Sequence, residues 1–338
     1  MEPPPYPETE SGPTQLLRAA EHGDEEAVKL ILERQDIDPN AADTNYGRTP
    51  LFWAVEQGHE GVVKLLLQQE GIDPNTADTE YGQTPLERAA LQGHQRIVKL
   101  LLGREDIKVN TPGPKSHVTP LGQAARAGHR RVVELLLERK DIDPNAGDHK
   151  CGRTPLWWAA DHGHEGTVKL LLKREDVNPN TADTEYSFTP LGRAARKGYI
   201  GVVKLLLERV DINPNTGDTN GRTPLILAVR RGYTGVVALL LKRGDVNPNA
   251  AGTRCGRTAL LWAVQMWYTG VVAVLLKRED INPNIADTKC GGTPLWWAAQ
   301  FGSVFPTGQV GQAAAKPSLA YGNSLGPGLA RAYRLCKA

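Results

Sequence analysis

A Thr-Pro-Leu tripeptide recurs at intervals of 34 or 35 residues along most of this 338-residue chain, and this spacing constrains the fold more than any other feature. Full copies begin at Thr49, Thr84, Thr119, Thr154, Thr189, Thr223 and Thr293, with weaker copies at Thr14 and Thr258. A period of this length is typical of chains in which one small unit is repeated and each unit packs on its neighbours. The sequence therefore predicts a solenoid.

Each unit reads as a helical hairpin, and the copy TPLWWAADHGHEGTVKLLL, which begins at Thr154, shows why. Thr154 is a favourable N-cap, and Pro155 suits the first helical position because the N–H that it lacks has no helical partner there. Gly163 supplies the left-handed conformation that ends a helix. A second helix follows at once, with Val168 and the run Leu170 to Leu172 as its apolar stripe. Neighbouring units must cover the faces that such short helices leave open.

The motif that opens each unit appears as TPLFWA, TPLWWA, TPLGQA and TPLILA, and it resembles the TPLHxA signature of the ankyrin repeat. The resemblance extends from Thr14 to Gly302. The resemblance implies an all-α ankyrin-repeat solenoid of stacked helix-turn-helix units with projecting turns or short β-hairpins. The units here exceed the usual ankyrin length of about 33 residues. Because the surplus lies in the links and turns, we expect long, irregular turns without strong strand pairing.

The chain divides into three predicted parts. Residues 1–13 are rich in Pro and Glu and lack apolar periodicity, so we expect them to be disordered. The repeat array spans residues 14–302, and residues 303–338 form a Gly-, Ala- and Pro-rich tail without a clear cap. The predicted units are residues 14–48, 49–83, 84–118, 119–153, 154–188, 189–222, 223–257 and 258–292, followed by the partial unit 293–302.

Two units depart from the pattern. The link before Thr119, KVNTPGPKSHV, has lost both the Asp and the Gly of the usual turn. The eighth unit reads Met266-Trp267-Tyr268 where other units place the helix-ending Gly. Without this Gly, we expect the eighth hairpin to be strained or re-angled.

Composition and motifs exclude several classes of protein. The sequence has no long apolar run and no signal-peptide pattern at its start, so we expect a soluble protein of the cytoplasm or nucleus that is not secreted. Cys151, Cys255 and Cys290 share one loop position, and stacked units are too far apart for them to pair with one another, so they should be reduced. Phosphate-binding loops, nucleophile elbows and metalloprotease helices are absent from the sequence, so we expect no enzyme and no cofactor.

Two series of ring-bearing residues look functional at first. His59, His94, His129 and His164 recur once per unit, roughly 8–10 Å apart in a stack, whereas zinc needs ligands at about 2 Å from one ion. We therefore expect these imidazoles to bond nearby backbone and to bind no metal. Trp53, Trp158, Trp262 and Trp297 also share one position and are expected to pack between units, whereas Trp157 and Trp296 should show an edge to solvent.

Binding is the activity that the resemblance implies, in a concave groove made by the turn tips and the first helices. The groove positions vary between units, and in the sixth to eighth units they are strongly basic. The chain as a whole has a net charge of +2, but the stretch from Thr119 onward carries a net charge of +11. The residues predicted to contact a partner are Arg126, Arg153, Trp157, Asp161, His162, Tyr186, Phe188, Arg196, Lys197, Arg222, Arg230, Arg231, Arg257 and Met266.

These features favour a non-catalytic protein-interaction scaffold or adaptor that binds a partner with an acidic or phosphorylated segment, because guanidinium groups make bidentate contacts with carboxylates and phosphates. Two alternatives stay open at this stage. One is a binder of nucleotides or single-stranded nucleic acid, with bases stacked on Trp157 or Trp296. The other is the sensing fragment of a larger multidomain regulator. No membrane association is expected, and the chain should be monomeric unless its uncapped C-terminal end associates.

Overall fold

The computed structural model describes residues 12–34 and 36–300, and the regular elements in that range are α-helices. The expectations for residues 1–11 and for the tail at 303–338 concern chain outside the described residues. The chain divides into two parts, which meet between Asn178 and Pro179. Each part is described separately.

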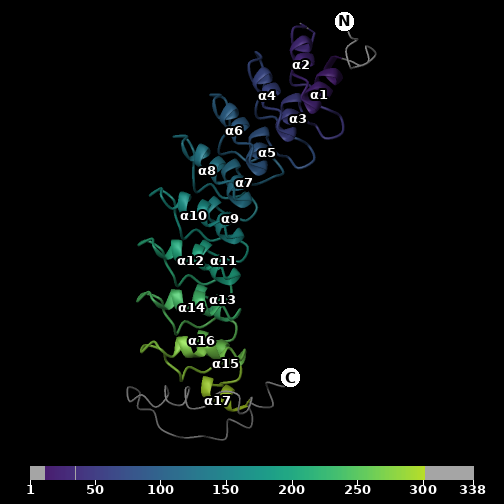
Figure 1. The fold of residues 1–338 in the computed structure, drawn as a ribbon. Coiled ribbons are helices and arrows are strands. Elements are labelled where there is room, and N and C mark those ends of the chain that lie inside the picture. The colour runs from purple at the N-terminus through teal and green to yellow at the C-terminus, as the bar shows by residue number, and fades with distance from the viewer. Residues whose placement is uncertain (1–11, 35, 301–338) are drawn as a thin grey trace. The chain divides into compact units, whose positions relative to one another are not determined.

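The first part contains ten helices in pairs (Figure 1). They are α1 (Gly12–His22), α2 (Glu25–Leu32), α3 (Pro50–Gln57), α4 (Glu60–Leu67), α5 (Pro85–Gln92), α6 (Gln95–Leu102), α7 (Pro120–Ala127), α8 (Arg130–Leu137), α9 (Pro155–His162) and α10 (Glu165–Leu171). The odd-numbered helices pack on one another in order, as do the even-numbered ones, which gives two layers. The first helix begins at Gly12, two residues before the predicted start of the array.

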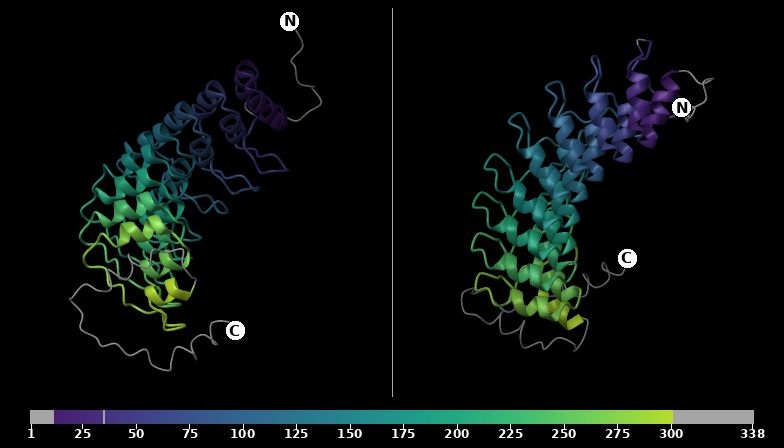
Figure 2. Two further views of the ribbon diagram at one scale, coloured as in Figure 1. Left: turned by 60° about the horizontal axis from the view of Figure 1, so that its bottom comes forward. Right: turned by 45° about the horizontal axis from the view of Figure 1, so that its top comes forward.

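The second part repeats this arrangement, and Figure 2 shows its two layers from other directions. Its helices are α11 (Pro190–Lys197), α12 (Ile200–Leu207), α13 (Pro224–Val229), α14 (Thr234–Leu241), α15 (Ala259–Gln265), α16 (Thr269–Leu275) and α17 (Pro294–Gln300). Helices α11, α13, α15 and α17 form one layer, and α12, α14 and α16 form the other. The predicted all-α solenoid of helical hairpins is confirmed.

The helices begin where the sequence predicts. Thr154 has extended backbone angles, and its hydroxyl accepts a hydrogen bond from the Trp157 amide, directly before Pro155 opens α9. Thr84 goes further and forms a capping box with Glu87, in which each side chain accepts from the other residue's backbone N–H. The repeated motif forms the core. In each complete Thr-Pro-Leu copy up to Thr223, the Leu is almost fully buried, as are the Ala or Val residues three and four positions after it.

Left-handed glycines end most of the first helices, and the packing of the next unit adds a second reason for them. Gly23 has a φ of 76°, and a Cβ placed there would lie 2.6 Å from the imidazole of His59. Gly128 stands in the same relation to His164, with a Cβ distance of 2.7 Å. A side chain at this position would therefore be disfavoured both by the backbone conformation and by contact with the next unit.

The eighth unit keeps its helix end without glycine. Trp267 adopts a φ of 63°, in the left-handed region that Gly occupies elsewhere, and α15 ends at Gln265. The Tyr268 amide donates to the Ala263 carbonyl at 3.0 Å, as the Tyr233 amide does to Ala228 at 3.1 Å in the preceding unit. Of the two outcomes expected for this hairpin, the structure shows backbone strain, while the hydrogen bonds at the helix end are those of its neighbour.

The turns before each Thr are irregular, as expected. Within the described ranges the only strand-like pairing is a single bridge between Ala251 and Thr258, so the short β-hairpins that were also anticipated are not found. The second residue before the Thr has positive φ in each complete turn, including His117 at 59° and Ser187 at 58° where other units have Gly.

The cysteines agree only in part with the expectation of three reduced thiols. Cys151 and Cys255 are free thiols as predicted, whereas Cys290 is disulfide-bonded. The prediction was wrong for Cys290 because the spacing argument applied only to pairs of cysteines within this loop position.

Two side-chain systems that the sequence analysis did not predict tie the links of adjacent units together. In the first, Arg139 makes a bidentate pair with Asp141 and reaches the Leu102 carbonyl of the preceding unit at 3.0 Å. In the second, Asn110 donates to the Asp141 carbonyl at 2.7 Å and accepts from the Asp143 amide at 2.8 Å. Equivalent Arg–Asp pairs and Asn bridges recur in both parts, so each link is fixed by its neighbour.

Candidate functional site

The histidine series has a structural role. His59, His129 and His164 each direct Nε2 to a carbonyl near the end of the preceding unit's first helix, those of Glu21, Leu91 and Arg126, at 2.9, 2.9 and 3.0 Å. The expectation that the imidazoles bond backbone is confirmed for these three, whereas Nε2 of His94 is buried without a hydrogen-bond partner in the described residues. Among the described residues, no group of three or more His, Cys, Asp or Glu side chains is arranged to hold a metal ion. No helix in the same ranges is sufficiently long and apolar to cross a membrane.

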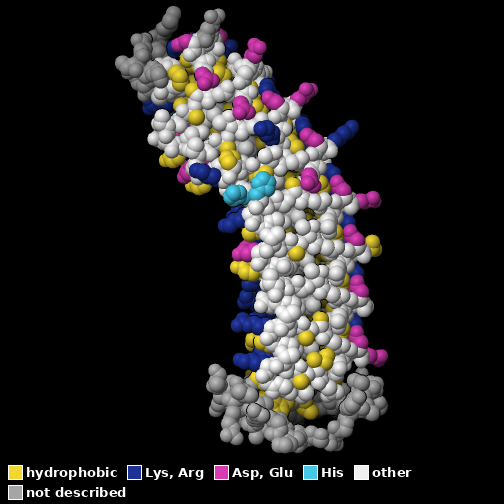
Figure 3. Space-filling model, turned by 180° about the vertical axis from the view of Figure 1, so that it is seen from behind, with side chains coloured by type: hydrophobic (Ala, Val, Ile, Leu, Met, Phe, Trp, Pro, Cys, Tyr) yellow, Lys and Arg dark blue, Asp and Glu magenta, His cyan; other side chains and the backbone are white. Residues whose placement is uncertain are grey.

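A cluster of arginines lies in the second part of the chain, and we call Arg196, Arg222, Arg230, Arg231, Arg254 and Arg257 the arginine cluster. Arg196 lies in the last turn of α11, Arg230 directly follows α13, and the others come from the adjoining turns and helix end. Figure 3 shows Lys and Arg side chains along one edge of this part, while carboxylates alternate with further Lys and Arg side chains along the opposite edge. Arg222, Arg230, Arg254 and Arg257 line one hollow, and Arg196 and Arg231 are close enough to Arg222 and Arg230 to interact electrostatically with them.

Crowding and burial perturb this cluster. Partial burial lowers the pKa of Arg196, and the positive charges of Arg193, Arg231 and Arg222 lower it further. Burial likewise lowers the pKa of Arg230, together with the charges of Arg222 and Arg231. A guanidinium stays protonated despite such shifts, so their meaning is electrostatic: these groups repel one another and an added anion would relieve the repulsion.

One carboxylate within the described residues partly neutralises the cluster. Asp218 accepts from Nε of Arg222 at 2.7 Å and from its own turn's backbone. Asp211 pairs with Arg209 of its own link and not with the cluster. Arg196, Arg230, Arg231 and Arg254 make no ion pair with any residue that the structure describes.

Two arginines on the corresponding surface of the first part are neutralised internally. Arg48, which is only 7 % exposed, contacts Glu56 at 2.9 Å and Glu80 at 2.8 Å. Arg88 contacts the same Glu56 at 2.6 Å. Because both cations already have carboxylate partners, this surface offers less attraction to an acidic ligand than the arginine cluster does.

Two aromatic residues predicted to contact a partner are instead buried beneath arginines. Trp157 is 2 % exposed, with the guanidinium of Arg153 at 4.7 Å from its ring centroid, so the expectation that its edge faces solvent is wrong. Phe188 is also 2 % exposed, with Arg193 and Arg196 at 5.3 and 5.0 Å from its ring. These rings support and orient the guanidinium groups.

The remaining predicted residues divide by exposure. Asp161 is buried at 8 % exposure, whereas Arg126, His162, Tyr186, Lys197 and Met266 are exposed, and Arg153 and Arg257 are half-buried. Trp158 and Trp297 are buried as the packing hypothesis predicts, while Trp53 and Trp262 are only half-buried. Arg126, Arg153, Trp157, Asp161 and His162 lie in the first part of the chain, apart in sequence from the arginine cluster.

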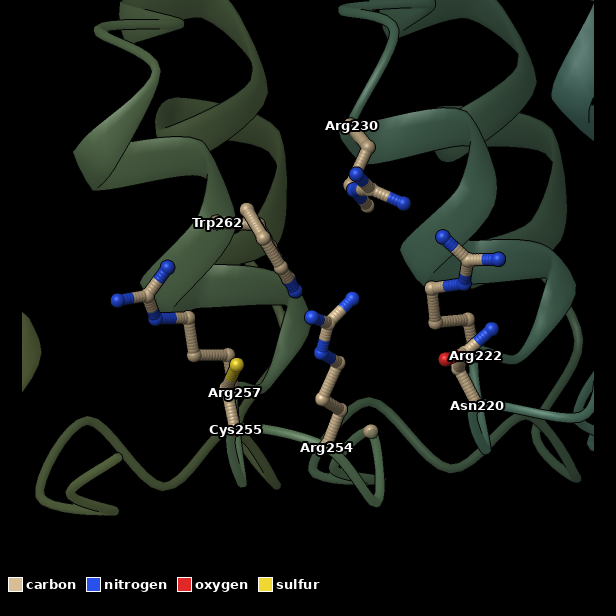
Figure 4. Close-up of a pocket in the computed structure, with 8 residues that line it drawn as sticks. Asn220, Arg222, Arg230, Arg254, Cys255, Arg257 and Trp262 are labelled. Atoms are coloured by element: carbon tan, nitrogen blue, oxygen red, sulfur yellow. The ribbon is translucent and has the colours of Figure 1, made fainter. Parts of the chain in front are cut away.

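A hollow of about 160 Å³ opens within the arginine cluster. Figure 4 shows the side chains of Arg222, Arg230 and Arg254 around this space, together with the indole of Trp262. The lining residues are Asn220, Arg222, Arg230, Gly252, Arg254, Cys255, Arg257 and Trp262. Of these, Arg222, Arg230 and Arg257 were predicted to contact a partner and the others were not; the sequence signal for Gly252 is its place in a turn position that holds Asp in most other units.

Comparison with protein-family models gives one family. A model of ankyrin repeats, built of three copies, matches residues 5–78, 70–148, 121–218 and 191–287. A search of curated proteins found no match to the chain. Because the family model covers well over half of the sequence, and because the helical hairpins, caps and layered packing agree with it, the chain belongs to the ankyrin-repeat family.

Proposed function

We propose that this ankyrin-repeat protein is a non-catalytic scaffold whose arginine cluster binds an acidic or phosphorylated segment of a partner protein. Ankyrin repeats are in general protein–protein interaction modules. The observation that supports the acidic partner is the set of guanidinium groups in the second part that lack ion-pair partners, in contrast to the paired Arg48 and Arg88 of the first part.

Electrostatic and steric features both support this proposal. Arg231 is exposed and Arg196 and Arg230 are half-buried, so a ligand can reach them, and partial desolvation strengthens the contacts that they make. Phe188 beneath Arg196 and Trp262 beneath Arg230, at 5.0 and 4.6 Å, limit the motion of the two guanidinium groups. Such preorganisation reduces the entropy lost when a partner binds.

The structure gives less support to a nucleic-acid ligand. That alternative requires an exposed indole on which a base can stack; of the two indoles named for it, Trp157 is 2 % exposed and Trp296 is half-buried. An extended acidic peptide needs only guanidinium and amide donors, which the arginine cluster offers. We place the proposed scaffold in the cytoplasm or nucleus, as a monomer that acts without a membrane or a cofactor.

The test is a triple substitution, Arg196→Gln with Arg230→Gln and Arg231→Gln, in the full chain. Charge-assisted hydrogen bonds contribute about 1.5–3 kcal/mol each, so binding of a fluorescein-labelled Glu-rich peptide should weaken on the order of 100-fold or more. Its dependence on salt concentration should also decrease, because fewer charges take part.

A charge-matched control separates local contacts from net charge. Lys204→Gln with Lys242→Gln and Lys277→Gln removes three exposed positive charges on or beside α12, α14 and α16, in the other layer of the same part. This control should bind the peptide within about threefold of the unmodified chain, since distant surface charges are screened. Equal losses in the two triple variants, or no loss in the first, would reject the assignment of the binding surface.

A further inference from the structure

A carboxylate at one position holds most of the turns together. In the turn before Thr49, Asp43 accepts from the backbone amides of Asn45, Tyr46 and Arg48 at 2.9, 2.6 and 3.2 Å. Asp183 accepts from three amides of its own turn in the same way. The same position, six residues before the Thr, is occupied by Asp78, Asp148 and Asp287, which also accept from turn amides.

The turn before Thr258 has lost this carboxylate and kept the backbone arrangement that surrounds it. Gly252 stands at the Asp position, and its amide donates to the Arg257 carbonyl at 3.1 Å. The Gly256 amide donates to the Gly252 carbonyl at 2.9 Å. The matching distances around Asp43 are 3.0 and 3.1 Å. The turn is therefore built as if the carboxylate were present.

The donors that this carboxylate would serve are left without acceptors. The backbone amides of Arg254, Cys255 and Arg257 correspond to those that Asp43 binds, and within residues 12–34 and 36–300 none of them donates a hydrogen bond. The Nε atoms of Arg230 and Arg257 are also buried without a hydrogen-bond partner there, as are those of Arg48 and Arg88 in the first part. The indication of a site for an acceptor therefore comes from the three amides, because successive backbone N–H groups in a turn form a concavity that binds anionic groups.

Another turn of the same chain shows how a missing Asp can be partly replaced. In the turn before Thr119, Gly113 occupies the Asp position, and Glu87 from α5 supplies a carboxylate. Glu87 is fully buried and accepts from the Gly113 amide at 3.1 Å and from the Ser116 hydroxyl, but not from the turn amides that correspond to those bound by Asp43. The residue equivalent to Glu87 in the unit that contains Gly252 is Ile226, whose side chain has no acceptor.

The tryptophan position provides a second indication of the same missing group. Trp53 and Trp297 donate their indole N–H to Asp43 and Asp287 at 3.0 and 2.7 Å, whereas the indole N–H of Trp158 makes no hydrogen bond to Asp148. Trp262 occupies the same position in its unit, where Gly252 replaces the Asp acceptor. In Figure 4 the nitrogen end of its indole is turned toward the space framed by Arg222 and Arg254.

We propose that the hollow beside Gly252 receives one carboxylate group of the acidic partner, the side chain of an Asp or Glu, in the place that the chain's own Asp takes in other turns. The identification of the occupant as part of a protein rests on the proposed function. The hollow of about 160 Å³ has room for the carboxylate together with part of the side chain that carries it. A planar group with two acceptor oxygens matches the amide arrangement, as Asp43 and Asp183 show.

The direct test is Gly252→Asp, which supplies the carboxylate from within the chain. A Cβ at Gly252 would lie 3.3 Å from the Asn220 carbonyl oxygen and 3.7 Å from Cγ of Arg222, so the side chain fits with a small adjustment. We expect the melting temperature to rise by about 2–4 °C, as the unpaired amides gain an acceptor. Binding of the labelled Glu-rich peptide should weaken about tenfold or more, because the site is already filled.

Gly252→Ala is the matched control, since it adds the Cβ without the carboxylate. It should bind the peptide like the unmodified chain and should show no rise in melting temperature. If Gly252→Asp leaves both quantities unchanged while the Arg196, Arg230 and Arg231 variant loses binding, the carboxylate site is wrong and the proposed function stands. If neither variant affects binding, both proposals fail.

A second measurement identifies the bound group. In ¹⁵N-resolved spectra of the full chain, the amides of Cys255 and Arg257 should shift on titration with the Glu-rich peptide and should not shift in Gly252→Asp. Inorganic phosphate and the same peptide with phosphoserine in place of Glu are the comparison ligands. Tighter binding of either phosphate ligand at these amides would overturn the assignment of a carboxylate.

Discussion

Glu87 offers the sharpest test of how a helix side chain stabilises the turn that precedes the next Thr-Pro-Leu copy. It is fully buried, and it accepts from the Thr84 amide at 2.6 Å and the Gly113 amide at 3.1 Å, as well as from the Ser116 hydroxyl. Glu87→Ala would leave these donors without an acceptor. Each unsatisfied buried donor costs about 1–3 kcal/mol.

The net destabilisation should be about 3–5 kcal/mol. Part of the loss is offset because water can enter the space and accept from the freed donors, and because the buried carboxylate no longer has to be desolvated. Urea unfolding followed by circular dichroism measures it. Amide hydrogen exchange at Gly113 locates the change, since repeat arrays can unfold locally. Glu87→Gln, which keeps the shape and one acceptor oxygen, should lose roughly half as much.

The pH dependence of Glu87 follows from its burial. Burial raises the pKa of this carboxyl, against the opposing effect of the hydrogen bonds from Ser116, Thr84 and Gly113. The folded state therefore holds the proton more strongly than the unfolded state, so this group's contribution to stability falls as pH rises from its ordinary pKa through the raised one. Glu70→Ala, at an exposed site, is the control. A change of less than about 0.5 kcal/mol on Glu87→Ala, the range typical of surface sites, would refute this account.

Two further predictions concern the turns and links. Ser187→Gly should raise the free energy of unfolding by about 0.5–1 kcal/mol, because Ser187 holds a φ of 58° that glycine adopts without a Cβ penalty; an unchanged or lower urea midpoint would contradict it. The hydrogen bond from Arg139 lowers the pKa of Asp141. Hydrogen bonds from the arginines of the other links lower the pKa values of the equivalent carboxyl groups in the same way, those of Asp106, Asp176, Asp211, Asp245 and Asp280. The stability that these ion pairs contribute is fully present above the ordinary pKa of 3.8 and is lost as pH falls through the lowered pKa values. Arg139→Gln should therefore make the melting temperature less sensitive to acid. An unchanged dependence of the melting temperature on acidic pH would count against the pairs.

The hairpins could be predicted from sequence because their determinants are local. A Thr N-cap, a Pro at the first helical position and a Gly at the helix end act within a few residues, so their pattern defined α3, α5, α7, α9, α11 and α13 closely. The positive φ of Ser187 and Trp267 could not be read from residue type, because both residues disfavour this conformation. The packing of adjacent units imposes it.

Interactions between units account for what the sequence analysis missed. Arg139 and Asp141 look like ordinary surface charges in the sequence, and only the fold brings Arg139 to the Leu102 carbonyl. The basic surface followed from aligning the units, but the sequence does not show that Arg48 is neutralised by Glu56 while Arg230 is left unpaired. Exposure of Trp157 was predicted wrongly because the guanidinium of Arg153 covers its ring.

The central claim is that an acidic partner contacts the arginine cluster. Phenylglyoxal modification of the full chain, read by mass spectrometry with and without the Glu-rich peptide, tests it most directly because it reports individual arginines. The bound peptide should protect Arg196, Arg230 and Arg231 and should leave the exposed Arg96 and Arg131 of the first part equally reactive. Unchanged modification of Arg196, Arg230 and Arg231 by a saturating peptide, or protection confined to Arg96 and Arg131, would contradict it.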